Sequence, residues 1–95
     1  MTESVDVLSG GKARMEIAVY PLGTGDANVS REVSAIFDVL EDCGLTYEIT
    51  VMGTMIEGTP DELFALARRL HDVVFSETVR RVVTLIKIDD RRQDV

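Results

Sequence analysis

The sequence is poor in the residues that carry most metal, redox and nucleophilic chemistry. Its 95 residues include one cysteine, so no internal disulfide can form and a reducing cytoplasm is the expected location. The single histidine, His71, has no second histidine and no nearby cysteine, which excludes a histidine-rich metal site. Cys43 has no evident histidine partner to activate it as a nucleophile. We therefore expect no catalytic residues, no metal and no cofactor, with His71 facing solvent on a helix.

Long apolar runs and basic charge are also missing. No segment approaches the ~20 apolar residues of a membrane span, and the N-terminus lacks the basic-then-apolar order of a signal peptide. The formal net charge is −7. Nucleic-acid affinity depends on neutralising phosphates, so this balance argues against a nucleic-acid partner. We expect no membrane partner either, and the acidity suits a cationic or neutral small ligand.

The apolar residues that are present, 45% of the chain, suffice for one packed domain. Residues 1–12 contain Ser9-Gly10-Gly11 and no sustained pattern, so we predict a flexible tail followed by a domain over residues 13–95. Alternation and β-branched content predict four strands, over Met15–Tyr20 (ended by Pro21), Thr46–Met52, Thr54–Glu57 and Val82–Ile88.

Two segments have helical spacing instead. The first carries one apolar face and can be capped by Asn28 or Ser30 and ended by Gly44; its face consists of Val29, Val33, Ile36, Phe37 and Leu40. The second begins at a capping box, Thr59-Pro60-Asp61-Glu62, and buries Leu63, Leu66, Ala67, Leu70 and Val74. The order strand, helix, strand, strand, helix, strand predicts an α+β, ferredoxin-like sandwich. In that fold both helices cover one face of a four-stranded antiparallel sheet.

The last strand has two largely apolar faces. Val82, Thr84, Ile86 and Ile88 point one way, and Val83, Leu85 and Lys87 point the other. Two helices cover only one side of the sheet, so the other side needs a second layer, most simply another copy of the chain. We predict a homo-oligomer, with a tetramer built as a dimer of dimers. Alternation alone does not say which face the helices cover.

A few polar residues interrupt the apolar strands. Thr50, Thr54 and Thr84 lie within β-rich runs, and Glu57 ends one. Together they can supply hydroxyls and a carboxylate to a small-ligand pocket, or they can simply be strand residues. The loop Gly23-Thr24-Gly25-Asp26 can likewise be a polar-ligand loop or an ordinary turn into a helix.

Three segments resemble the small thiamine-binding protein family. They are Ile17–Gly25, Met52–Gly58 and Arg81–Arg92, and with the helices between them they cover roughly residues 14–93. The resemblance implies a ferredoxin-like fold, dimers paired into tetramers through sheet faces, no catalytic activity, and binding of thiamine or its hydroxymethylpyrimidine moiety. It also implies that Thr24, Thr54, Glu57 and Thr84 contribute to the pocket.

Three functional hypotheses remain open on the sequence. The first is a cytoplasmic oligomer that binds thiamine or hydroxymethylpyrimidine, with Glu57 pairing with the ligand's cation or amino group. The second is a regulatory or structural oligomerisation module without a physiological small ligand. The third is an enzyme that uses Asp89 or Asp90; these adjacent residues point to opposite faces of a strand, so ion pairs with Arg91 or Arg92 are the simpler role.

Overall fold

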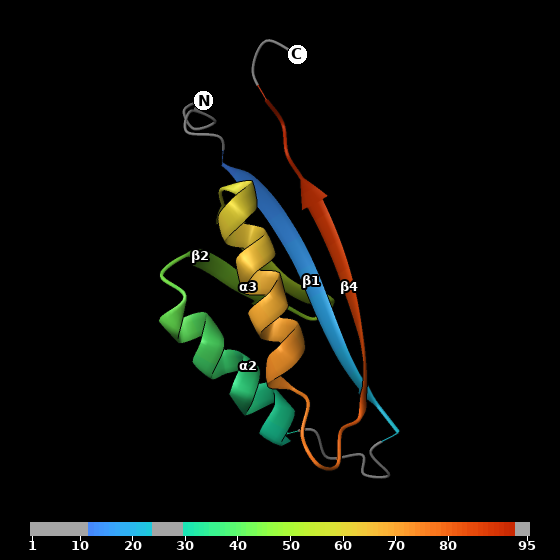
Figure 1. Cartoon of the computed structure of the whole chain (residues 1–95). Helices are drawn as coiled ribbons and strands as arrows, with labels where there is room; N and C mark the ends of the chain where they lie inside the picture. The colour runs from blue at the N-terminus through green and yellow to red at the C-terminus, as the bar shows by residue number, and fades with distance from the viewer. Residues whose placement is uncertain (1–11, 24–29, 93–95) are drawn as a thin grey trace.

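Four antiparallel strands form one sheet, and two helices cover a single face of it (Figure 1). This computed structural model describes residues 12–23 and 30–92. The elements in chain order are β1 (Ala13–Leu22), α2 (Ser30–Asp42), β2 (Thr46–Thr50), β3 (Gly53–Gly58), α3 (Pro60–Val73) and β4 (Arg81–Asp89). The sheet order is β2-β3-β1-β4, so the predicted ferredoxin-like fold is confirmed. Apart from Lys12, the predicted tail lies outside the described residues.

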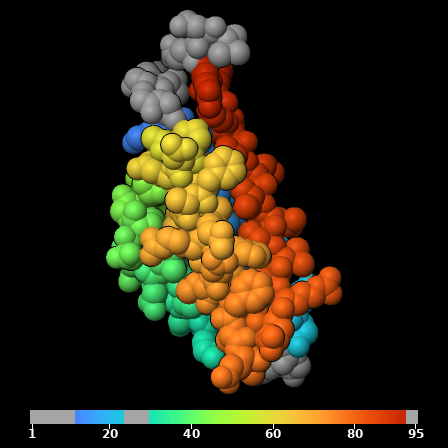
Figure 2. Space-filling view, in the orientation of Figure 1, coloured from blue at the N-terminus to red at the C-terminus, as the bar shows by residue number. Residues whose placement is uncertain are grey.

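The core lies between the sheet and the helices. Ala13, Met15 and Ile17 of β1 point toward the helices and are 4%, 0% and 3% exposed. The side of α3 that faces the sheet is buried as predicted and consists of Leu63, Leu66, Ala67, Leu70 and, just after the helix, Val74. Figure 2 shows this covered face, with α3 lying between α2 and β4. A continuous apolar layer therefore holds the helices to the central strands.

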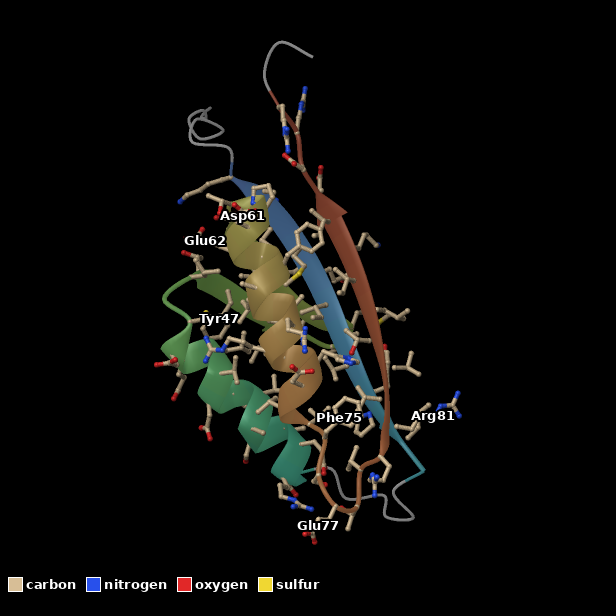
Figure 3. The ribbon with its side chains drawn as sticks, in the orientation of Figure 1. Tyr47, Asp61, Glu62, Phe75, Glu77 and Arg81 are labelled. Atoms are coloured by element: carbon tan, nitrogen blue, oxygen red, sulfur yellow. The ribbon has the colours of Figure 1, made fainter. Side chains whose placement is uncertain are left out.

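The start of α3 has the predicted capping box. The Thr59 hydroxyl accepts a hydrogen bond from the Glu62 backbone N–H at 3.2 Å, and the Glu62 carboxylate accepts one from the Thr59 N–H at 2.9 Å. Two backbone donors of the first turn are thereby satisfied. Figure 3 shows Asp61 and Glu62 together at this end of the helix. The local sequence alone thus determined where α3 begins.

Helix α2 is described over Ser30–Asp42, and Gly44 follows its end with a φ of 75°. Its predicted apolar face is only partly buried. Leu40 is 1% exposed, whereas Val33 and Phe37 are 46% and 42% exposed. Val33 and Phe37 lie on the predicted apolar face, but they stay partly exposed because they border a hollow in the sheet.

Strand β1 continues beyond the predicted stop at Pro21 and ends at Leu22. It pairs with β4 over Arg14–Leu22 but with β3 only over Ala13–Ile17. Proline lacks a backbone N–H, so it is tolerated where no ladder hydrogen bond is required. The second half of β1 has a neighbour on one side only, which allows proline inside the strand.

The face of the sheet opposite the helices is bare. This face carries ion pairs and also exposed apolar side chains. The exposed apolar side chains include Tyr20 (46% exposed), Val83 (37%) and Leu85 (60%). Register places Ile86 on the helix side, opposite Ile17. Of the two β4 faces, the one with Val83 and Leu85 is therefore the one left without a second layer. No helix in the described part of the chain combines the length and hydrophobicity needed to cross a bilayer.

Candidate ligand-binding site

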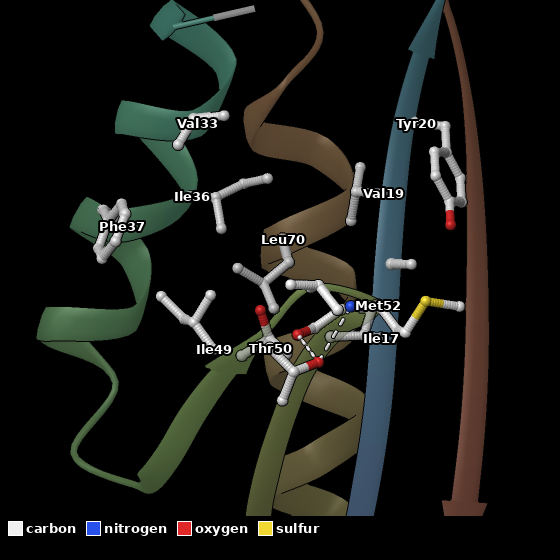
Figure 4. A pocket seen from close by; sticks show the side chains of 14 residues that line it. Ile17, Val19, Tyr20, Val33, Ile36, Phe37, Ile49, Thr50, Met52 and Leu70 are labelled. Atoms are coloured by element: carbon white, nitrogen blue, oxygen red, sulfur yellow. Dashed lines mark hydrogen bonds between the residues drawn. The ribbon is translucent and has the colours of Figure 1, made fainter.

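The hollow beside α2 is a notch in the sheet. Strand β3 stops opposite Ile17, while β1 runs on to Leu22 with no strand on that side. The hairpin tip between β2 and β3, Val51 and Met52, closes one end of the notch, and α2 forms the wall across from β1. Figure 4 shows the side chains of this pocket arranged around the open space. The unequal lengths of β1 and β3 create the pocket.

We call this hollow the notch pocket. It has a volume of about 270 Å³. Its walls come from β1, β2, β3 and both helices and are mainly apolar, with Val19, Val33, Ile36, Phe37, Ile49 and Leu70 among them. None of the described residues that line it is charged. Such a cavity favours an uncharged, flat or branched group of small size.

A hydrogen-bonded turn fixes the hairpin tip at the edge of the pocket. The Thr50 hydroxyl donates to the Gly53 carbonyl at 2.9 Å and accepts from the Met52 backbone N–H at 3.2 Å. Gly53 has a φ of 154°, and a Cβ there would lie 2.7 Å from the Ile17 carbonyl oxygen. The close approach of β3 to β1 at this point therefore requires glycine.

Thr54 and Thr84, two of the predicted ligand residues, both point toward the helices. Thr54 is 9% exposed and lines the notch pocket. Thr84 lies on β4 opposite Val19, and its hydroxyl is hydrogen-bonded to His71 Nδ1 at 2.7 Å. Thr84 is not among the described residues that line the pocket. The structure thus brings Thr54 to the site and gives Thr84 a different partner.

His71 has a structural role that the sequence did not indicate. It is half-buried on α3, and its ring also packs edge-on against Phe75 with 5.4 Å between the ring centroids. Figure 3 shows Phe75 just beyond the end of α3. The expectation that His71 faces solvent is wrong, because its contact with Thr84 ties α3 to the outer strand β4.

Glu57 lies on the bare face of the sheet. It forms an ion pair with Arg14, with Nε and Oε2 3.2 Å apart, and it is partly exposed. It lines a second, polar groove of about 200 Å³, together with Glu48 and Met55. Thr54 and Glu57 are an odd number of residues apart on one strand, so their side chains point to opposite faces. Within one chain, these two predicted ligand residues therefore belong to different grooves.

The remaining candidates do not extend either groove. Thr24 lies outside the described residues. Asp90 forms an ion pair with Arg92 at 2.8 Å, as expected for a charged strand end. The hydrogen bond and charge of Asp90 raise the pKa of the exposed Arg92 guanidinium. In the described ranges, no three His, Cys, Asp or Glu side chains gather as metal ligands would.

Sequence reasoning missed the main walls of the notch pocket. The sequence predicts Val33, Ile36 and Phe37 only as part of the apolar face of the first helix, and Val19 only as part of the first strand. Two signals pointed to the notch: Pro21 close to that strand, and the predicted third strand, which is much shorter than its neighbours. Together they indicate a central strand that outruns its partner on one side.

The sequence also matches a family model described as thiamine-binding protein over residues 15–95. The chain belongs to the thiamine-binding protein family. Two relatives are a UPF0045 protein of Methanothermobacter thermautotrophicus and the UPF0045 protein YqgV of Bacillus subtilis. The first is 40% identical over 78 residues, covering 81% of this chain and 79% of the relative. The second is 36% identical over 81 residues, covering 81% and 78% respectively.

Several solved structures have the same fold as this chain. Protein MJ1052 of Methanocaldococcus jannaschii superposes with a TM-score of 0.77 at 34% identity, covering 90% of this chain and 86% of that one. A Thermotoga maritima protein, assigned provisionally to thiamine biosynthesis or salvage, has a TM-score of 0.72 at 21% identity, with 84% of each chain covered. At that lower identity the likeness supports the family fold alone.

Proposed function

We propose that this member of the thiamine-binding protein family is a non-catalytic, cytoplasmic protein that binds thiamine or its hydroxymethylpyrimidine moiety as an oligomer. The observation that carries the proposal is the notch pocket: an uncharged, mainly apolar cavity in a chain of this family. Its volume of about 270 Å³ lies just below the roughly 300–1,000 Å³ of typical small-molecule sites. A single substituted ring is the size of ligand that such a cavity suits.

The walls suit an aromatic ring. Branched aliphatic side chains from β1 and α2 face each other across the pocket. Phe37, which also belongs to α2, adds an aromatic side chain to the lining. A flat heteroaromatic ring placed between them removes apolar surface from water, which is worth roughly 25 cal/mol per Å² buried. The cationic thiazolium of thiamine, in contrast, is better left near the solvent, where the acidic chain attracts it.

The chemistry of the lining supports binding more than turnover. Apart from the Tyr20 phenol, its described residues include no acid, base or thiol. The Thr50 hydroxyl is already engaged on both sides by the hairpin turn. Acid–base or nucleophilic catalysis requires an activated group within reach of the substrate.

The bare sheet face supports the oligomeric part of the proposal. Tyr20, Val83 and Leu85 form an exposed apolar strip over neighbouring strands β1 and β4. Sheets without helices on one side are stabilised when a second layer covers that side. Two dimers that pack through this face give the tetramer predicted from the sequence.

Calorimetric titration with thiamine and with hydroxymethylpyrimidine tests the proposal. The wild-type protein should bind at least one of them. Val33→Trp fills the pocket from α2 and should lower the affinity at least about tenfold, since the ring and the indole cannot occupy one space. Ser34→Trp is the matched control, because Ser34 is the exposed neighbour outside the lining. Equal affinity of both variants would show that the notch pocket is not the site.

The alternative is an oligomerisation module without a physiological small ligand. The exposed apolar strip around Leu85 favours it, because that strip needs a partner whether or not the pocket is filled. The same titration separates the two functions. A wild-type protein that assembles but releases no heat with either compound, and does not melt at a higher temperature in their presence, supports the module.

A further inference from the structure

We propose that the notch pocket recognises its ligand through the main chain of Val19 and therefore selects an uncharged, unphosphorylated ring that carries a hydrogen-bond donor beside an acceptor. This inference rests on the proposed function and names the substrate class of the same pocket. The direction in which the backbone groups of β1 point decides whether Val19 can make this contact.

The Ile17 carbonyl marks the direction. Its oxygen would lie 2.7 Å from a Cβ on Gly53, so it points toward β3. In an antiparallel strand, the N–H and C=O of one residue point to the same side, and successive residues alternate between sides. The Val19 N–H and C=O therefore point toward the same edge as Ile17. At Val19 that edge has no β3 beside it, because pairing with β3 ends at Ile17.

Pro21 supports this direction independently. It follows the same alternation as Ile17 and Val19, so its nitrogen also points toward the open edge, away from β4. A proline there costs no hydrogen bond to β4, and the pairing of β1 with β4 indeed continues through Pro21 to Leu22. Pro21 thus lies at a strand position where no backbone N–H is needed for pairing with β4.

The Val19 N–H and C=O are polar groups in a mainly apolar pocket. Val19 lines the notch pocket, and its side chain is half-buried opposite α2. Backbone N–H and C=O groups that leave water need partners. A ligand edge with one acceptor and one adjacent donor satisfies both, as the next strand would have done. The ring nitrogen and exocyclic amine of an aminopyrimidine form such an edge.

The same pocket opposes a phosphate group. No described lining residue is Lys, Arg or His, and the chain carries a net charge of −7. Moving a phosphate dianion against apolar walls without a cationic partner is strongly unfavourable. The pocket therefore discriminates between a free alcohol and its phosphate ester on the same ring.

NMR-detected amide exchange tests the main-chain contact. In the free protein, the Val19 amide should exchange faster than that of Ile17, which is paired with β3. Saturating hydroxymethylpyrimidine should slow Val19 exchange at least about tenfold and move its amide proton resonance, while the Ala18 amide, bonded to β4, changes little. If the ligand binds but Val19 exchange is unchanged, the inference is overturned and the proposed function stands.

Two further comparisons sharpen the test. Val19→Pro removes the donor at the open edge and exchanges one apolar lining side chain for another. It should weaken binding about three- to tenfold, with a melting temperature close to that of the wild type. Tyr20→Pro is the matched control; it removes a donor to β4 and should lower the melting temperature far more. The phosphate ester of hydroxymethylpyrimidine should bind at least about tenfold more weakly than the alcohol. Equal binding of ester and alcohol contradicts the selection against phosphate, and a wild-type protein that binds no pyrimidine overturns both proposals.

Discussion

The two faces of the sheet carry similar apolar residues with very different surroundings. Ile56 points under the helices and is 1% exposed, whereas Leu85 points away from them and is 60% exposed. Among the described residues, the covered face is closed over Met15, Ile17 and Ile56 and opens at the notch beside Val19. The bare face mixes an apolar strip with ion pairs such as Arg14–Glu57. One face has completed its packing within the chain, and the other has not.

This contrast also explains the distribution of the predicted ligand residues. Thr54 belongs to the covered face and lines the notch pocket, while Glu57 belongs to the bare face and its polar groove. Polar residues that are close in sequence on a strand do not share a site unless their spacing is even. A ligand in the notch pocket therefore meets Thr54 and not Glu57 of the same chain.

The largest effect is expected at the closed part of the covered face. Ile56→Ala should lower the free energy of unfolding by about 2–5 kcal/mol, because it leaves a cavity under both helices. Ile49→Ala is the matched control on the neighbouring strand, where the side chain is 46% exposed and much less is lost. Urea unfolding of both variants measures the difference. Equal losses would break the contrast between closed and open positions.

A smaller but clear effect is expected on the bare face. Leu85→Asp should dissociate the oligomer, because it places a carboxylate in the apolar strip at a cost of about 2 kcal/mol or more per interface. Phe64→Asp makes the same change at a side chain of matching exposure, 59%, on helix α3. Light scattering at micromolar concentration distinguishes the two. A wild-type species of one chain would refute the oligomer itself.

Loss of the contact between Thr84 and His71 should lower stability modestly and leave ligand binding unchanged. Thr84→Val removes the hydroxyl that joins β4 to α3 and should cost about 0.5–1.5 kcal/mol of unfolding free energy. Ligand affinity should change little, since Thr84 does not line the notch pocket. A large loss of affinity with unchanged stability would instead return Thr84 to the ligand site that the sequence predicted.

The smallest effect is expected at Glu57. Its ion pair with Arg14 is exposed, so Glu57→Gln should change the unfolding free energy by less than about 1 kcal/mol. Affinity for thiamine or hydroxymethylpyrimidine should stay within about twofold of wild type, because the carboxylate is on the other face. A ten- to hundredfold loss in calorimetry would place the ligand in the polar groove and support the sequence prediction for Glu57.

Much of the fold could be read from the chain because its signals are local. The capping box at Thr59, the helical spacing of Leu63 to Val74 and the strand composition of Val82–Ile88 each act over a few residues. The element order then restricts the topology to very few arrangements. The errors fall at Pro21 and His71, where neighbours across the sheet decide how far the strand runs and what the side chain contacts.

The sequence by itself determined the order and type of the elements, the start of α3 and the fact that β4 has two apolar faces. Only the tertiary structure decided which β4 face the helices cover, that His71 binds Thr84, and that Thr54 and Glu57 face different grooves. The notch pocket belongs to the second group. It arises from the unequal reach of β3 and β1, and strand lengths and pairing depend on contacts between residues far apart in the chain.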